Sequence, residues 1–262
     1  MTARLELIAL EGFPLVHPGD DLAQLIIDAL NDNDLTLQND DVLVIAQKIV
    51  SKAEGRYVRL ADVTASAAAL SLAEQADKDP RQVELILRES NEVIRVRPGV
   101  IIVEHRNGYV HANAGIDRSN IPNQSDDPQV LLLPEDPDAS AAALRCTLAE
   151  RINIAPQVII NDSMGRAWRN GTVGLAIGTA GLNPLHNQIG EQDMFGNLLE
   201  VTEPAVADEL AAAASLVMGQ AAQACPVVLA RGAALPKAEC GSGALLRDLS
   251  LIHISEPTRP PS

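Results

Sequence analysis

Lys48 and Lys52 are half of the four lysines in this chain, and both lie in the segment AQKIVSKAEGR. On a helix, residues four positions apart lie on the same face, so these two ammonium groups could bind one anion such as a phosphate. Gln47 precedes them and adds an amide to the cluster. A solvated helix face that binds no ligand is the alternative interpretation of the same spacing.

Oxygen-bearing side chains gather in two other segments. Residues 113–120 (NAGIDRSN) bring a carboxylate, a guanidinium and an amide together, and Asn161, Asp162 and Ser163 follow an apolar run at residues 158–160. Carboxylate, hydroxyl and amide oxygens are the ligands that Mg²⁺ and similar hard cations prefer. The competing interpretations are an ordinary Asn/Gly turn for the first segment and a capping residue for the second.

A fourth segment, residues 218–225 (MGQAAQAC), interrupts an alanine-rich stretch with Gly219 and Gln220. A glycine inside a helix costs about 1 kcal/mol relative to alanine. Its presence therefore suggests that a ligand or another backbone comes close at this point. Tight packing between helices would explain it equally well.

The common phosphate-binding and hydrolase motifs are missing from the sequence. It contains no GxxxxGK[ST], no GxGxxG after a strand, no GxSxG and no HExxH, and its five histidines lack the spacing of metal ligands. A phosphorylated ligand would have to be bound by individually placed cations, backbone N–H groups or metal ions.

The four segments follow apolar runs that read as secondary-structure elements. Short, unbroken apolar runs at residues 41–46 and 157–160 predict strands buried on both faces. Further strands are predicted at residues 5–10, 93–96, 100–104 and 171–181. Helices are predicted at residues 22–30, 65–75, 81–88, 138–153 and 202–224, the last being the longest.

Strands and helices intermix without a regular βαβ repeat, so the predicted fold class is α+β, with mixed α/β sheets and helices. We expect one domain over residues 1–248, with a boundary between two halves in the loop-like residues 121–138, which are rich in Pro, Asp, Asn and Gln. Residues 249–262 fit no core pattern, and we interpret them as a non-native or disordered tail.

The composition of the chain limits the kinds of molecule that it could bind and the compartment in which it could work. The 262-residue chain has a formal net charge of -15, which argues against binding to nucleic acid. Its three cysteines are widely spaced and form no CxxC pair, which fits a reducing cytoplasm. The sequence has neither a signal-peptide pattern nor a long apolar run, so we expect no membrane association.

Taken in order along residues 4–248, several motifs resemble those of the coenzyme F420:L-glutamate ligase (F420-0:gamma-glutamyl ligase) family. They are EGFPLV, AQKIVSKAEGR, NAGIDRSN, NDSMGRAWRNGTVGLAIGTAG, DMFGNLLEVTEPAVADELAAAASLVMGQ and GSGALLRD. The resemblance implies the α+β glutamyl-ligase fold of that family and an interlocked homodimer.

The resemblance also implies a nucleotide site and a metal site. The guanine nucleotide would contact Gly12, Phe13, Pro14, Leu15, Gln47, Lys48, Lys52, Asn120, Met218, Gly219, Gln220, Ala221, Ala222, Gln223, Ala224 and Cys225. The divalent metal ligands would be Asp117, Asp162, Ser163 and Gln220. Expected cofactors are GTP as co-substrate and Mg²⁺ or Mn²⁺, with K⁺ as a further candidate.

The implied reaction is a GTP-dependent addition of L-glutamate to the coenzyme F420 precursor through an acyl phosphate. A related ligase with a different acceptor and a non-catalytic nucleotide-binding protein are the alternatives. Spacing alone assigns no catalytic base. We expect Arg118 and Arg166 to hold a substrate carboxylate or phosphate, with salt bridges to surface carboxylates as the alternative.

Overall fold

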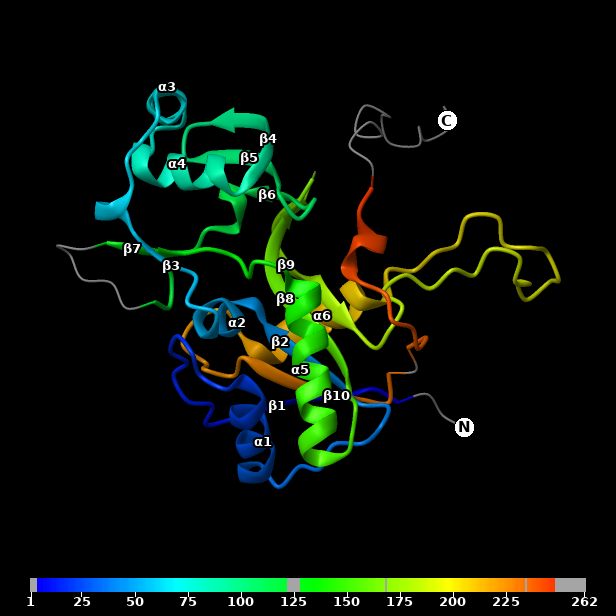
Figure 1. Cartoon of the computed structure of the whole chain (residues 1–262). Coiled ribbons are helices and arrows are strands. Elements are labelled where there is room, and N and C mark those ends of the chain that lie inside the picture. Colours follow the sequence, from blue (N-terminus) through cyan, green and yellow to red (C-terminus); the bar gives the residue numbers. More distant parts are fainter. Residues whose placement is uncertain (1–3, 122–127, 168, 234, 248–262) are drawn as a thin grey trace.

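The computed structural model describes residues 4–121, 128–167, 169–233 and 235–247 (Figure 1). The predicted tail at residues 249–262 lies outside these ranges, as does part of the predicted linker. The described part has a mixed α/β architecture with a five-stranded, a three-stranded and a two-stranded sheet. None of its helices is both long and apolar enough to cross a lipid bilayer.

A five-stranded sheet with the order β1-β10-β2-β8-β9 forms the centre of the molecule. Its strands are β1 (Glu6–Ala9), β10 (Val227–Arg231), β2 (Val42–Ala46), β8 (Gln157–Arg166) and β9 (Arg169–Ala180). β2 and β8 are parallel, and the other neighbouring pairs are antiparallel. The buried parallel pair therefore sits inside the sheet, as the unbroken apolar runs of β2 and β8 predict.

Helices cover both faces of this sheet. On one face, α1 (Leu22–Asp32) and α5 (Pro137–Ile152) pack against alternate residues of the strands, including Ile45 and Ile160. On the other face, α6 (Val206–Met218) packs against Val44 and Ile159. Neighbouring residues of β2 and β8 thus belong to two different cores, and this explains why β2 and residues 158–160 of β8 form unbroken apolar runs.

The three-stranded sheet forms a smaller unit above the central sheet in Figure 1. Strands β4 (Ser90–Arg97), β5 (Val100–His105) and β6 (Val110–Ala112) pair antiparallel, and α3 (Ala67–Ala76) and α4 (Pro80–Arg88) pack against them. Two connecting strands, β3 (Tyr57–Arg59) and β7 (Gln129–Leu131), form the two-stranded sheet. The short helix α2 (Gln47–Ala53) links β2 to β3.

Two glycines of β9 let the helices approach the central sheet closely. A Cβ atom at Gly174 would lie 2.5 Å from the carbonyl oxygen of Ala211 in α6, and one at Gly178 would lie 2.4 Å from the carbonyl oxygen of Pro137 in α5. The alternation of glycine and apolar residues in GTVGLAIGTAG therefore reflects helix packing on both faces of the strand.

Residues 182–205 leave the core as a long extended arm (Figure 1, yellow). The arm turns back on itself at an isolated bridge between Gln192 and Leu198. Its tip exposes 95% of Met194 and 87% of Phe195. An extended segment with such exposed apolar side chains was not predicted from the sequence.

Two predicted elements need correction. The helix predicted at residues 202–224 covers only α6, because Pro204 precedes its first turn and Gly219 at its C-cap has a φ of +72°, which a continuing helix cannot adopt. Among the described residues, the longest helix is α5, with 16 residues. The strand predicted at residues 157–160 continues as β8 to Arg166, so Asn161, Asp162 and Ser163 lie inside a strand. The other predicted elements occur near their expected positions. Four strands, β3, β6, β7 and β10, were not predicted, and β7 lies within residues 121–138, which were expected to form a loop.

Candidate active site

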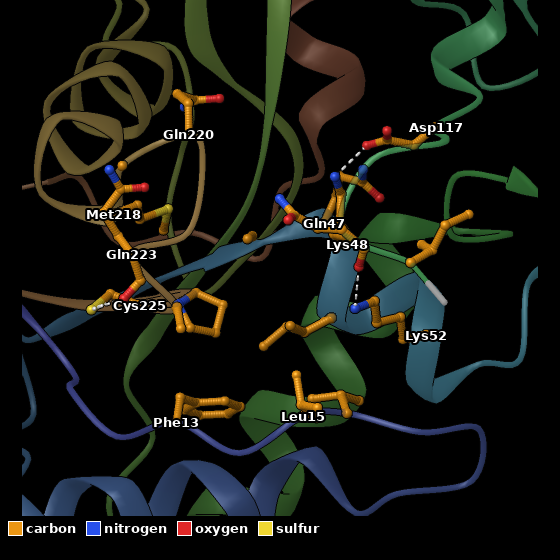
Figure 2. Close-up of a pocket in the computed structure, with 18 of the residues that line it drawn as sticks. Phe13, Leu15, Gln47, Lys48, Lys52, Asp117, Met218, Gln220, Gln223 and Cys225 are labelled. Carbon is orange, nitrogen blue, oxygen red and sulfur yellow. Dashed lines mark hydrogen bonds and ion pairs between the residues drawn. The ribbon is translucent and has the colours of Figure 1, made fainter. Parts of the chain in front are cut away.

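A cavity of about 500 Å³ lies where the β1–α1 loop, the junction of β2 with α2, strand β8 and the loop after α6 meet. Figure 2 shows Met218, at the end of α6, and Gln223, in the loop after it, facing Gln47 and Lys48 across the cavity. Phe13 and Leu15 from the β1–α1 loop close the lower side in this view. A cavity of this size with apolar walls and a few polar groups is typical of small-molecule sites.

All the predicted nucleotide contacts except Gly12 line this one cavity. They are Phe13, Pro14, Leu15, Gln47, Lys48, Lys52, Asn120, Met218, Gly219, Gln220, Ala221, Ala222, Gln223, Ala224 and Cys225. Gly12 lies at the turn before them, with a φ of +71°. The fold thus brings together residues from four separate stretches of sequence.

The four predicted metal ligands, Asp117, Asp162, Ser163 and Gln220, also line the cavity. In Figure 2, Asp117 and Gln220 lie on opposite sides of it. Within the described ranges, no group of three or more His, Cys, Asp and Glu side chains is placed to hold a metal ion. The predicted set contains only two carboxylates, so any metal bound here would rely on hydroxyl and amide oxygens as well.

Gln47 and the two lysines reach the cavity because α2 begins directly after the buried strand β2. The Gln47 side chain is buried, and its Oε1 accepts a hydrogen bond of 2.9 Å from Ser51 Oγ one helical turn later. Ser51 thereby uses the acceptor end of this amide and leaves the N–H₂ end for a ligand. Lys48 and Lys52 both line the cavity, so one face of α2 supplies its positive charges.

The ammonium group of Lys48 is held by the segment that carries Asp117. Lys48 Nζ lies 2.5 Å from Asp117 Oδ2, and it donates to the carbonyl and hydroxyl oxygens of Ser119 at 3.1 and 3.0 Å. Asp117 Oδ1 accepts from the backbone N–H and the hydroxyl of Ser119, both at 2.8 Å. Lys52 Nζ donates to the Asn120 carbonyl at 2.8 Å. Each charged group of this edge therefore has a protein partner.

These contacts shift the pKa values of two of the groups. Burial raises the pKa of Asp117, but Lys48 and the Ser119 donors outweigh burial and hold it below its ordinary value. Burial lowers the pKa of Lys52, and the positive charge of Lys48 lowers it further. The two lysines therefore place two ammonium groups on one wall of the cavity, one of them paired with Asp117.

Asp162 has a partner that was not among the predicted site residues. His111 Nε2 lies 3.0 Å from Asp162 Oδ2, and the two side chains are 10% and 12% exposed. Burial lowers the pKa of His111, but the contact with Asp162 and the Ala112 carbonyl raise it above the ordinary value overall. His111 and Asp162 are 51 positions apart in sequence, so no local motif could have revealed the contact.

Arg118 and Arg166 do not line the cavity. Arg118 is exposed, and its charge acts on Lys78 and Asp79 between α3 and α4. Arg166 lies at the far end of β8. The geometry gives no support to the expectation that they hold a substrate in this cavity.

Known proteins resemble this chain over most of its length. The family model described as F420-0:Gamma-glutamyl ligase matches residues 12–232. Curated proteins named Coenzyme F420:L-glutamate ligase are 51% identical in Methanothermobacter thermautotrophicus and 47% identical in Methanopyrus kandleri. The first alignment covers 87% of this chain and 89% of the relative, and the second covers 88% and 87%.

A third relative of the same name, from Methanosarcina mazei, is 42% identical, with 87% of this chain and 86% of the relative aligned. The matched residues 12–232 of the family model include α2, β8, the loop after α6 and most of the β1–α1 loop, which are the elements that build the cavity. The chain therefore belongs to the F420-0:Gamma-glutamyl ligase family, a family of ligases that form amide bonds.

Proposed function

We propose that this chain is a cytoplasmic, GTP- and divalent-metal-dependent ligase that adds L-glutamate to the coenzyme F420 precursor F420-0 and then adds further γ-linked glutamates. Its membership of the family supports the acceptor and the amino acid. The observation that carries the nucleotide and metal assignment is that two lysines and four oxygen-bearing side chains line one cavity.

The residues of the cavity fit a hard divalent cation. Asp117, Asp162, Ser163 and Gln220 offer carboxylate, hydroxyl and amide oxygens, which suit Mg²⁺ and Mn²⁺. Neither cysteine nor a histidine ring is needed in this set. Such an ion would neutralise negative charge on the phosphate groups during transfer.

The lysines are placed to bind phosphate oxygens once Lys48 leaves Asp117. A metal ion bound to Asp117 would compete with the ammonium group for the same carboxylate, because Lys48 Nζ now lies 2.5 Å from Asp117 Oδ2. Lys48 would then turn its N–H donors to the nucleotide. Gln47 would present its N–H₂ group to an acceptor atom of the ligand, since Ser51 occupies the other end of the amide.

The proposed reaction has two steps. A carboxylate oxygen of the acceptor attacks the γ-phosphorus of GTP, the bond from that phosphorus to the β,γ-bridging oxygen breaks, and GDP leaves. The amino nitrogen of glutamate then attacks the acyl carbon, loses a proton, and displaces inorganic phosphate. The binding residues contribute by holding the phosphates and the acceptor in line.

We also propose that the arm at residues 182–205 mediates a homodimer. Its tip exposes Met194 and Phe195, and Val201 is 85% exposed. Apolar side chains at the end of an extended arm gain stability only when another surface covers them. A second copy of the chain offers such a surface and an equivalent arm in return.

The direct test is an activity assay read by mass spectrometry. Purified protein is incubated with F420-0, GTP, Mn²⁺ and L-glutamate, and we expect products heavier by one or more glutamyl residues. Asp117→Ala should abolish them, whereas Asp62→Ala, an exposed aspartate outside the cavity, should not. GTP turnover without a glutamylated coenzyme would point to a related ligase with a different acceptor.

A further inference from the structure

His111 connects the two parts of the chain that carry the proposed acidic metal ligands. It lies in β6 of the three-stranded sheet, and its Nε2 atom contacts Asp162 in β8 of the central sheet. The chain continues from His111 through a single 3₁₀ turn, Asn113–Gly115, to Asp117. Fixing His111 against Asp162 therefore fixes the path of the segment that delivers Asp117.

The Asp162 carboxylate is oriented by one donor on each oxygen. Its Oδ1 accepts the backbone N–H of Ser163 at 2.8 Å, and its Oδ2 faces His111 Nε2 at 3.0 Å. The other ring nitrogen of His111 lies 2.9 Å from the Ala112 carbonyl oxygen. Both ring nitrogens thus face oxygen acceptors, which is the arrangement of a histidine that donates two hydrogen bonds.

His111 does not itself line the cavity, whereas Asp162 does. We propose that His111 is a positioning residue, which holds Asp162 in the orientation needed to bind a divalent cation and aligns the Asp117 segment with it. The inference rests on the proposed metal site. Partners behind the ligating residues are known to orient carboxylates and imidazoles, and their loss typically weakens metal binding about 10- to 100-fold.

A histidine between two sheets could also serve stability alone, so the test must separate the two roles. His111→Leu fills the same space without a donor, and His111→Gln keeps an N–H group at a similar distance from the backbone. If His111 served stability alone, the effect of each variant would depend only on how well its new side chain packs. If His111 is a positioning residue, the variant that keeps an N–H donor should retain metal affinity, and the variant that lacks one should lose it.

Mn²⁺ binding, followed by electron paramagnetic resonance in the presence of saturating GDP, supplies the readout. We expect His111→Leu to weaken Mn²⁺ binding roughly 10- to 100-fold and His111→Gln to retain most of the wild-type affinity. A His111→Leu protein with a native circular dichroism spectrum and wild-type Mn²⁺ affinity would overturn the inference.

Asp162→Asn in the same titration distinguishes this failure from failure of the metal site. If Asp162→Asn and the wild type bind Mn²⁺ equally well, the metal assignment falls and the role of His111 falls with it. If Asp162→Asn loses Mn²⁺ and folded His111→Leu does not, only the role of His111 is overturned.

The wild-type protein provides a second measurement in case His111→Leu does not fold. In protein labelled with ¹⁵N-histidine, nuclear magnetic resonance should show a proton bonded to His111 Nε2. The chemical shift of this N–H group should change when Mg²⁺ and GDP are added together. An Nε2 without a proton could not donate to Asp162 and would contradict the proposal.

Discussion

At the scale of single residues, the ion pair between Lys48 and Asp117 joins the proposed phosphate site to the proposed metal site. Each group neutralises the other, and the two side chains are 21% and 25% exposed. The same contact that stabilises the free protein must therefore be exchanged when a nucleotide and a metal ion bind. Removing the Asp117 carboxylate should therefore change nucleotide binding at Lys48, and removing the Lys48 ammonium group should change metal binding at Asp117.

Asp117→Asn should accordingly raise the affinity for GDP measured without metal, although it removes a site residue. Lys48 would no longer face a carboxylate, and we expect a gain of about threefold to tenfold, which corresponds to about 1 kcal/mol. Mn²⁺ should raise the GDP affinity of the wild type, and Asp117→Asn should lose this increase. Isothermal titration calorimetry with GDP, in EDTA and in Mn²⁺, measures both effects.

Asp62→Asn serves as the control because Asp62 is exposed and outside the cavity. If Asp117→Asn lowers the metal-free affinity for GDP, then Lys48 is not released as we propose.

At the scale of elements, an ionic cluster around the buried Glu89 connects the smaller unit to the segment between α2 and β3. Glu89, which caps α4 and is 8% exposed at its side chain, lies 2.9 Å from Arg56 and 3.5 Å from Arg106. Burial raises the pKa of Glu89, but His105, Arg56 and Arg106 together hold it below the ordinary value. Its stabilising contribution is therefore present above the unfolded-state pKa and is lost as the pH falls through the lower folded-state pKa.

We expect Glu89→Ala to reduce the free energy of unfolding by about 3–5 kcal/mol at pH 7, because it leaves two arginines facing an uncompensated site. The difference from wild type should shrink as the pH drops below about 4.3, the pKa of an unfolded glutamate. Urea unfolding at a series of pH values measures this, with exposed Glu92→Ala as the control. A difference that stays constant down to acidic pH would contradict the assignment.

Close packing of α6 on β9 gives a second prediction about an element. A Cβ at Gly174 would collide with the Ala211 carbonyl, so Gly174→Ala should destabilise the protein by about 2 kcal/mol. Gly165 in the same hairpin has open space around the corresponding position, and Gly165→Ala should have little effect. Thermal unfolding of the two variants would show whether backbone proximity at Gly174 determines the difference.

At the scale of the whole molecule, the sequence predicts the buried strands and most helices because their patterns are local. The apolar runs of β2 and β8 and the amphipathic period of α1 depend on residues within one element. The end of α6 was placed too late because alanine-rich sequence gives the same signal inside and beyond the helix. Gly219 ends α6 through its backbone conformation.

The candidate site was partly accessible to sequence reasoning for a related reason. Polar segments after apolar runs, together with family motifs, indicated Lys48, Asp117 and Asp162. Pairings between distant segments, such as His111 with Asp162, depend on how two sheets meet, and no spacing within the sequence encodes that. The exposed apolar side chains of the arm were not predicted either, because no local pattern in the sequence shows which apolar residues stay exposed.

The proposed dimer can be tested by introducing negatively charged side chains at the tip of the arm. Met194→Asp combined with Phe195→Asp should shift the protein from dimer to monomer in analytical ultracentrifugation, because two desolvated carboxylates oppose burial. Leu70→Asp, at an exposed apolar residue of α3 away from the arm, should leave the dimer intact. A wild-type protein that sediments as a monomer at micromolar concentration would contradict the assembly.

The central claim is that glutamate is joined to the coenzyme precursor through an acyl phosphate made from GTP. The most direct measurement uses F420-0 labelled with ¹⁸O in its carboxylate, incubated with GTP, Mn²⁺ and L-glutamate, and follows coenzyme and phosphate by mass spectrometry. We predict that the first glutamate addition releases one inorganic phosphate that carries one ¹⁸O from the F420-0 carboxylate, whereas each later addition, which activates a glutamate carboxylate, releases unlabelled phosphate. Singly glutamylated product with only unlabelled phosphate, or GTP turnover without glutamylated product, would contradict the account.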